Sequence, residues 1–155
     1  MEPTYADPGT PPAREDRRRS VTAAFVQLAS PFVFVGVLFF GLVVEIPVPV
    51  NRDPHGYGQI FGFLFSFLLM IPGIALPGIA IPLLRKARRG GAVLLIVASL
   101  MWVLLFLVLA TGFPGGIAEI EWSRIVTMVV SVLWAFLCCV CAWVGFRAFG
   151  RFPPR

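Results

Sequence analysis

The stretch VLLIVASLMWVLLFLVL, residues 93–109, decides the fold of this chain, because it contains neither a charged residue nor a proline. It belongs to a longer run without Asp, Glu, Lys or Arg, and three other parts of the chain are similar. The four uncharged runs cover residues 20–44, 54–84, 90–118 and 125–146. A helix of about 20 residues crosses a hydrocarbon core of about 30 Å, so each run is long enough to span a membrane.

Composition supports the same conclusion. Hydrophobic residues make up 58% of the 155 residues and charged residues only 14%, whereas globular chains have roughly 25% charged residues. So little charge could not cover a water-facing surface. The sequence therefore predicts an all-α membrane protein, a four-transmembrane-helix antiparallel bundle. Its spans are expected at about 21–44, 59–84, 92–112 and 125–146.

Basic residues are distributed unevenly along the chain, and their distribution predicts a topology. They precede the first span, fill the link between the second and third, and follow the fourth, so that eleven of the thirteen lie on one side. Short loops rich in Lys and Arg remain cytoplasmic. Both termini are therefore predicted to be cytoplasmic, in a multi-pass protein of the cytoplasmic membrane. The residues expected to determine topology are Arg17, Arg18, Arg19, Arg85, Lys86, Arg88, Arg89, Arg147 and Arg151.

This topology accounts for the net charge of +5 without a nucleic acid partner. The expected partner is the lipid bilayer, and a basic rim that touches anionic headgroups is compatible with it. Arginine outnumbers lysine twelve to one, a bias that is common in proteins from GC-rich bacterial genomes.

The sequence predicts three regions. Residues 1–20 are expected to be a disordered basic cytoplasmic tail, although its second half could continue the first helix. Residues 21–146 form the four-helix transmembrane domain, whose first span is too long for a cleaved signal peptide and is interpreted as an uncleaved anchor. Residues 147–155 are a short basic cytoplasmic tail.

Small residues recur at every fourth position in two of the spans. Lipid tails are as apolar as leucine, so membrane helices approach closely where their residues are small. The expected packing residues are Ser123, Thr127, Ser131, Ala135 and Cys139 in the fourth span, and Gly58, Gly62 and Ser66 in the second. These two stripes are expected to contact each other or a partner, with packing inside the chain favoured over oligomerisation.

The segment IPGIALPGIAIP, residues 71–82, interrupts the second span with prolines five residues apart. Each proline removes an amide donor and frees a carbonyl, which is costly in hydrocarbon. Successive prolines are rotated by about 140° around the helix, so they cannot form one contact stripe. The second helix is therefore predicted to be proline-kinked. The kink residues are Pro72, Pro77 and Pro82.

Two tryptophans lie at a depth where they could serve the broken helix. The antiparallel arrangement places Trp102 and Trp134 near the freed carbonyl of Leu68, and their indole N–H groups also need acceptors. We hypothesise that one or both indoles donate to this helix. A helix interrupted by Pro and Gly can also mark a transporter binding site. A transporter usually has a matching interruption in the other half of the chain. Here Pro31 is the one proline inside another span, so a structural kink is favoured.

The sequence contains no recognisable catalytic, cofactor or metal site. The spans carry no Asp, Glu, Lys or Arg, which argues against a proton-coupled exporter. The cysteines, Cys138, Cys139 and Cys141, are interpreted as small hydrophobic residues. A cluster in the outer loops is interpreted as solvated charge that could bind a metal only weakly. It comprises Glu45, Asp53, His55, Glu119 and Glu121, with Arg52 and Arg124.

Two main functions remain open, besides an enzymatic one that would require His55 to lie within ligand distance of at least two outer carboxylates. The first is a non-enzymatic accessory or interaction subunit whose partner is another membrane protein or a second copy. The alternative is a small oligomeric transporter or channel component that uses the broken second helix. A water-accessible cavity lined by Gln27, Gln59 or Ser66 would favour transport, and a dry, filled bundle would favour the accessory role.

Overall fold

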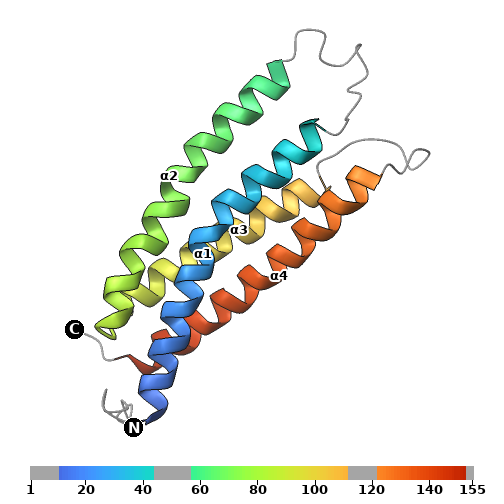
Figure 1. Cartoon of the computed structure of the whole chain (residues 1–155). Coiled ribbons are helices and arrows are strands. Elements are labelled where there is room, and N and C mark those ends of the chain that lie inside the picture. The colour runs from blue at the N-terminus through green and yellow to red at the C-terminus, as the bar shows by residue number, and fades with distance from the viewer. Residues whose placement is uncertain (1–10, 44–56, 112–121, 153–155) are drawn as a thin grey trace.

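The computed structural model describes residues 11–43, 57–111 and 122–152, and its regular structure there is entirely helical. Four helices follow one another antiparallel along one bundle axis (Figure 1). They are α1 (Pro11–Val43), α2 (Tyr57–Arg85), α3 (Arg89–Thr111) and α4 (Trp122–Arg151). Each is long and apolar enough to cross a membrane. The prediction of an all-α, four-helix protein of the multi-pass membrane type is therefore confirmed.

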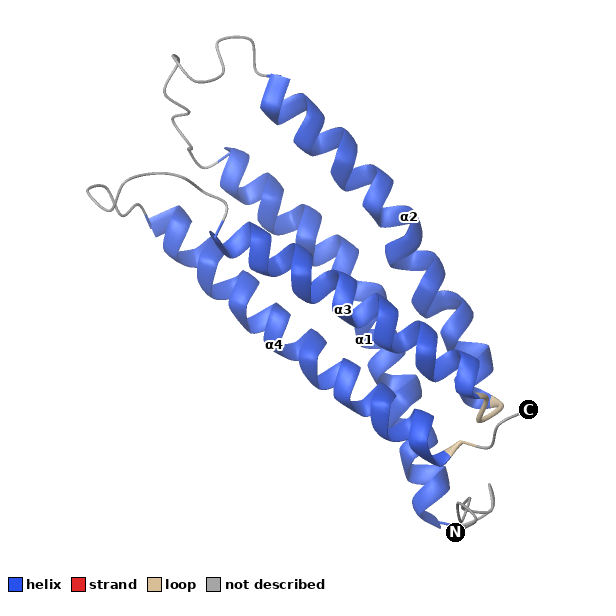
Figure 2. Ribbon diagram, turned by 180° about the vertical axis from the view of Figure 1, so that it is seen from behind, coloured by secondary structure: helices blue, strands red, loops and turns tan. Residues whose placement is uncertain are grey.

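The helices are arranged with α1 and α3 between α2 and α4 (Figures 1 and 2). α1 packs against the other three helices, and α3 packs against both outer helices. α2 and α4 do not contact each other within the described residues. Whether the small-residue stripes predicted on α2 and α4 meet stays a prediction, because the side chains of Gly58, Gly62, Ser66 and Ser123 lie outside the described part of the chain.

α1 begins ten residues before the predicted span, at Pro11. Proline is tolerated in a first helical turn, because the amides of that turn lack intrahelical acceptors in any case. Asp16 and Ser20 are buried, and the Ser20 hydroxyl donates to the Asp16 backbone carbonyl over 2.7 Å. Of the two expectations for the second half of the tail, the structure shows the helical one, because residues 11–20 continue α1 rather than being disordered. Residues 1–10 and 153–155 lie outside the described residues.

The short link between α2 and α3 is a helix C-cap. The amide of Ala87 donates to the Leu84 carbonyl over 2.9 Å, and the amide of Arg88 donates to the Leu83 carbonyl over 3.0 Å. This pair of bonds is a Schellman motif, which requires a left-handed residue after the helix. Ala87 occupies that position with φ 50°, where glycine would be less strained.

The core changes in character along the bundle. Near the arginine-rich end it is made mainly of alanines that let the helices approach, such as Ala24, Ala80 and Ala92. Glycine contributes there too, because a Cβ added to Gly91 would lie 2.7 Å from the Leu84 backbone nitrogen. Farther along, the core is aromatic. The ring of Phe34 lies 5.6 Å from that of Trp102 and 5.5 Å from that of Phe106.

α2 continues as one helix through its three prolines. Pro77 is fully buried, Pro72 is half-buried and Pro82 is exposed. The three rings thus face different surroundings, as their spacing predicts. The bend itself stays a prediction.

Candidate functional site

A cluster of polar side chains is buried between α1 and α4. The indole Nε1 of Trp134 donates to Ser30 Oγ over 3.0 Å, and Ser30 Oγ donates to Gln27 Oε1 over 3.2 Å. Cys138 Sγ lies 3.9 Å from both Ser30 Oγ and Gln27 Oε1. The cluster connects the first helix to the last in the middle of the bundle.

The periodicity of each helix brings these residues together. On α1, the buried positions Ser20, Gln27, Ser30 and Phe34 follow one another at spacings of seven, three and four residues and therefore form one face. This face of α1 is polar, unlike the faces of α3. Polar groups inside a membrane bundle bond to one another because lipid offers them no partner. The arrangement thus specifies which face of α1 meets α4.

Several buried polar atoms in the same bundle have no hydrogen-bond partner among the described residues. Gln27 accepts two contacts through Oε1, yet its Nε2 donates to none. The others are Ser99 Oγ, Trp102 Nε1, Thr127 Oγ1 and Ser131 Oγ. Leaving such atoms dry is unfavourable in hydrocarbon, so they are the strongest indication of a polar ligand or path inside the spans.

The predicted small stripe of α4 is only partly buried. Thr127, Ser131 and Ala135 face the core, but Cys139 is exposed and Cys138 is buried in its place. A strict four-residue spacing rotates by about 40° per step, and by about 120° from Thr127 to Cys139. The stripe therefore leaves the contact face, which continues through Cys138, Ala142 and Gly145.

The other predicted packing residues cannot be assigned to a contact. Gly58, Gly62 and Ser66 lie within α2, and Ser123 lies in the first turn of α4. The surroundings of these four side chains lie outside the described part of the chain. Gln59, the other candidate lining residue in the second span, also falls outside it.

The hypothesis that indoles donate to the broken helix is wrong for both tryptophans. Trp134 Nε1 donates to Ser30 on α1, and Trp102 Nε1 has no partner among the described residues. Trp102 nevertheless contacts α2 through its ring, because a Cβ added to Gly73 would collide with Trp102 Cζ2. Matching depth alone did not reveal which way each indole faces.

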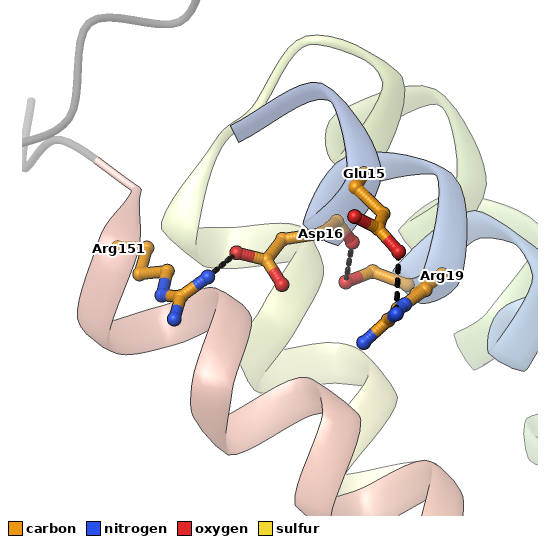
Figure 3. Close-up of polar contacts among 5 residues, drawn as sticks. Glu15, Asp16, Arg19 and Arg151 are labelled. Atoms are coloured by element: carbon orange, nitrogen blue, oxygen red, sulfur yellow. Dashed lines mark hydrogen bonds and ion pairs between the residues drawn. The ribbon is translucent and has the colours of Figure 1, made fainter. Parts of the chain in front are cut away.

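The basic residues gather at one end of the bundle, where both ends of the described chain also lie (Figure 1). Several have partners there. Arg151 of α4 forms an ion pair with Asp16 of α1, and Arg19 pairs with Glu15 (Figure 3). Arg89 Nε donates to the Phe152 carbonyl over 2.6 Å. The predicted gathering of the topology-determining arginines and lysine on one side is thus seen, whereas the compartment they face stays a prediction.

The candidate chemical groups fall only partly within the described residues. Among the described residues, no group of three or more His, Cys, Asp or Glu side chains could hold a metal ion. Cys138, Cys139 and Cys141 are free thiols. The outer-loop residues Glu45, Arg52, Asp53, His55, Glu119 and Glu121 lie outside the described residues, as does the side chain of Arg124. No protein-family model matches the chain, and neither a curated protein nor a solved structure shows significant similarity to it.

Proposed function

We propose that the protein is a non-enzymatic accessory or interaction subunit of the cytoplasmic membrane. The observation that supports this role is the sealed interior of the bundle. Gln27, Ser30, Ser99 and Ser131 each have 0% of their surface exposed. Polar groups that lined an open aqueous path would be in contact with solvent. A closed, packed bundle instead presents its outer faces to lipid and to other helices.

The outer face of α2 is the best docking surface for such a partner. In the most apolar stretch of α2, only 22% is buried in the bundle, whereas 39% of the corresponding stretch of α3 is buried. Exposed residues recur along α2 at spacings of three and four, which makes one continuous stripe. The stripe comprises Leu64, Leu68, Ile71, Ala75, Gly78 and Pro82. A Cβ added to Gly78 would meet nothing within 4 Å.

Ala75 and Gly78 leave a shallow strip between larger exposed neighbours such as Ile71 and Ile79. Membrane helices associate where small residues let backbones approach. A transmembrane helix of another protein, or α2 of a second copy, fits this strip. The prolines of the same helix would then shape the docking face.

Co-purification with matched variants tests this role. The full chain is crosslinked in native membranes, extracted in mild detergent and analysed for its bound partners. Gly78→Leu fills the strip and is expected to abolish the association. Gly36→Leu, at an exposed position of α1 that also meets nothing within 4 Å, should leave it intact. A chain that stays monomeric, or equal loss with both variants, would contradict the proposal.

The cytoplasmic location of both termini is part of the same proposal, and the gathering of basic residues at one end supports it. Epitope tags at the two ends, with protease added to sealed cells, test the orientation. Both tags should survive. Cleavage of either tag from outside would overturn the topology.

A second function, a small transporter or channel component, is favoured by the buried polar atoms without partners. Ser131 and Thr127 lie one turn apart on α4, and Ser99 and Trp102 lie one turn apart on α3. A water-filled state would give all of them partners. In a chain without its native cysteines, Ser131→Cys should react with a charged thiol reagent if this path opens, as Arg18→Cys does at the surface. Protection of Ser131→Cys would favour the accessory role.

A further inference from the structure

The arginine-rich end of the bundle carries a groove between α1 and α2 of about 650 Å³. Its rim is formed by guanidinium groups, and its floor is largely apolar. The lining residues are Arg14, Arg17, Arg18, Val21, Thr22 and Phe25 from α1, and Arg85 from α2. Successive α1 residues in this set are one or three positions apart, so they form one face of the helix.

The four arginines of this groove have no ion-pair or hydrogen-bond partner for their side chains among the described residues. Two other arginines at the same end are paired with carboxylates. Arg19 pairs with Glu15, and Arg151 pairs with Asp16 on the opposite side of α1 (Figure 3). Four like charges around one groove repel one another. An anion placed among them relieves that repulsion.

The lining of the groove changes along α1 from charged arginines to apolar side chains. Seven residues separate Arg18 from Phe25, which is about 10 Å along a helix that rises 1.5 Å per residue. Phe25 is half exposed and continues into the apolar surface of the span. A ligand for this groove therefore needs a negatively charged head and an apolar tail. That combination favours a membrane lipid over a free phosphate ion or a soluble nucleotide.

A second groove, on the α4 side of α1, differs from the first in the charge of its lining residues. It measures about 450 Å³ and is also lined by Arg18 and Arg19. However, the Glu15 carboxylate lines it as well and neutralises Arg19. An anionic headgroup would be repelled by that carboxylate. The described residues of the α1–α2 groove contain no acidic side chain.

We propose that the α1–α2 groove binds an anionic phospholipid. Its phosphodiester lies among Arg14, Arg17, Arg18 and Arg85, and an acyl chain lies along Val21 and Phe25. Guanidinium groups suit this role because they bind phosphate oxygens through two parallel hydrogen bonds. Basic pockets between transmembrane helices at the cytoplasmic surface are a setting in which such headgroups bind. The site goes beyond the proposed accessory role and would hold equally for a transporter.

Native mass spectrometry of the full chain tests the site, with phosphatidylglycerol and phosphatidylcholine of identical acyl chains as probes. The wild-type chain should retain one phosphatidylglycerol at a concentration at least about tenfold lower than that needed for phosphatidylcholine. Arg17→Gln with Arg85→Gln removes one guanidinium from each helix and should abolish most of this preference. Arg88→Gln with Arg147→Gln removes the same charge at the same end, outside the groove, and should change retention by no more than about twofold.

Two further measurements address a failure of the double variant to insert and competition by free phosphate. If the double variant does not insert, Arg85→Gln alone is compared with Arg147→Gln, and only the former should weaken phosphatidylglycerol retention. Inorganic phosphate at millimolar concentration should not displace the lipid, because it lacks the tail. Equal retention of the two lipids by the wild type, equal loss in the groove and control variants, or displacement by phosphate would each overturn the proposal.

Discussion

The indole Nε1 of Trp134 on α4 donates a hydrogen bond to Ser30 Oγ on α1, across 104 residues of sequence. Because Ser30 also donates to Gln27, the hydroxyl uses both its acceptor and its donor capacity. This three-residue relay, together with the contacts of Cys138 Sγ to Ser30 and Gln27, connects the first and last helices in the middle of the spans. It sets the rotation of α1 relative to α4.

Replacing Ser30 with alanine removes the acceptor and leaves the Trp134 N–H without a partner. Hydrogen bonds between membrane helices contribute about 0.6 kcal/mol on average. Ser30→Ala, Trp134→Phe and the double variant should therefore show a coupling energy of about that size. Reversible unfolding in mixed micelles measures it. A coupling energy of zero would mean that the bond does not stabilise the fold.

Gly91 and Gly90 are adjacent but differ sharply in the space around them. A Cβ at Gly91 would lie 2.7 Å from the Leu84 nitrogen and 3.0 Å from the Ala80 carbonyl oxygen, whereas one at Gly90 meets only Leu83 Cδ1 at 3.9 Å. Gly91→Ala must push α2 and α3 apart and should destabilise the protein by about 2 kcal/mol. Gly90→Ala is the matched control and should be neutral or slightly stabilising. Thermal unfolding in detergent distinguishes them, and equal effects would contradict the close approach.

The contact between Gly73 and Trp102 makes a similar prediction in the middle of α2. Gly73→Ala collides with the fully buried Trp102 ring and should destabilise the bundle by about 1–3 kcal/mol. Gly78→Ala, five residues farther along the same helix, meets open space and should be harmless or stabilising. Near-ultraviolet circular dichroism should also change for Gly73→Ala alone, because the indole must move. An unchanged spectrum with unchanged stability would show that α2 and α3 do not pack in this way.

Ala87 offers a stabilising substitution. A left-handed conformation costs a non-glycine residue roughly 1–2 kcal/mol. Glycine avoids this cost, but its greater entropy in the unfolded chain offsets part of the gain. Ala87→Gly should therefore raise the free energy of unfolding by about 0.5–1 kcal/mol. Ala29→Gly, at an exposed position inside α1, should lower it by a similar amount. A loss of stability in Ala87→Gly would contradict the C-cap geometry.

The sequence predicted the number and direction of the helices well, because each uncharged run such as 93–109 is long enough to span a bilayer by itself. It also predicted the gathering of basic residues, because they lie between and beside these uncharged runs. These are local properties of the chain. They do not depend on which helices become neighbours.

What the sequence missed depends on neighbours. The sequence left open whether the second half of the tail continues the first helix, and it could not reveal that Asp16 pairs with Arg151, a residue that is distant in sequence. The indole hypothesis matched Trp134 to α2 by depth, whereas the rotation of α4 turns it toward Ser30. Likewise, a strict four-residue spacing included Cys139, although the packed face passes through Cys138. Rotation about each helix axis is fixed by tertiary packing, which periodicity alone does not determine.

The relay between Ser30 and Trp134 also constrains how the chain is made. The ribosome adds about 5–20 residues per second, so α4 follows α1 after roughly 5–20 s. During this interval the Ser30 hydroxyl can donate to Gln27, but the indole N–H that will donate to it has not yet been synthesised. The hydrogen bond between α1 and α4 can therefore form only after α4, the last helix to be synthesised, has been inserted.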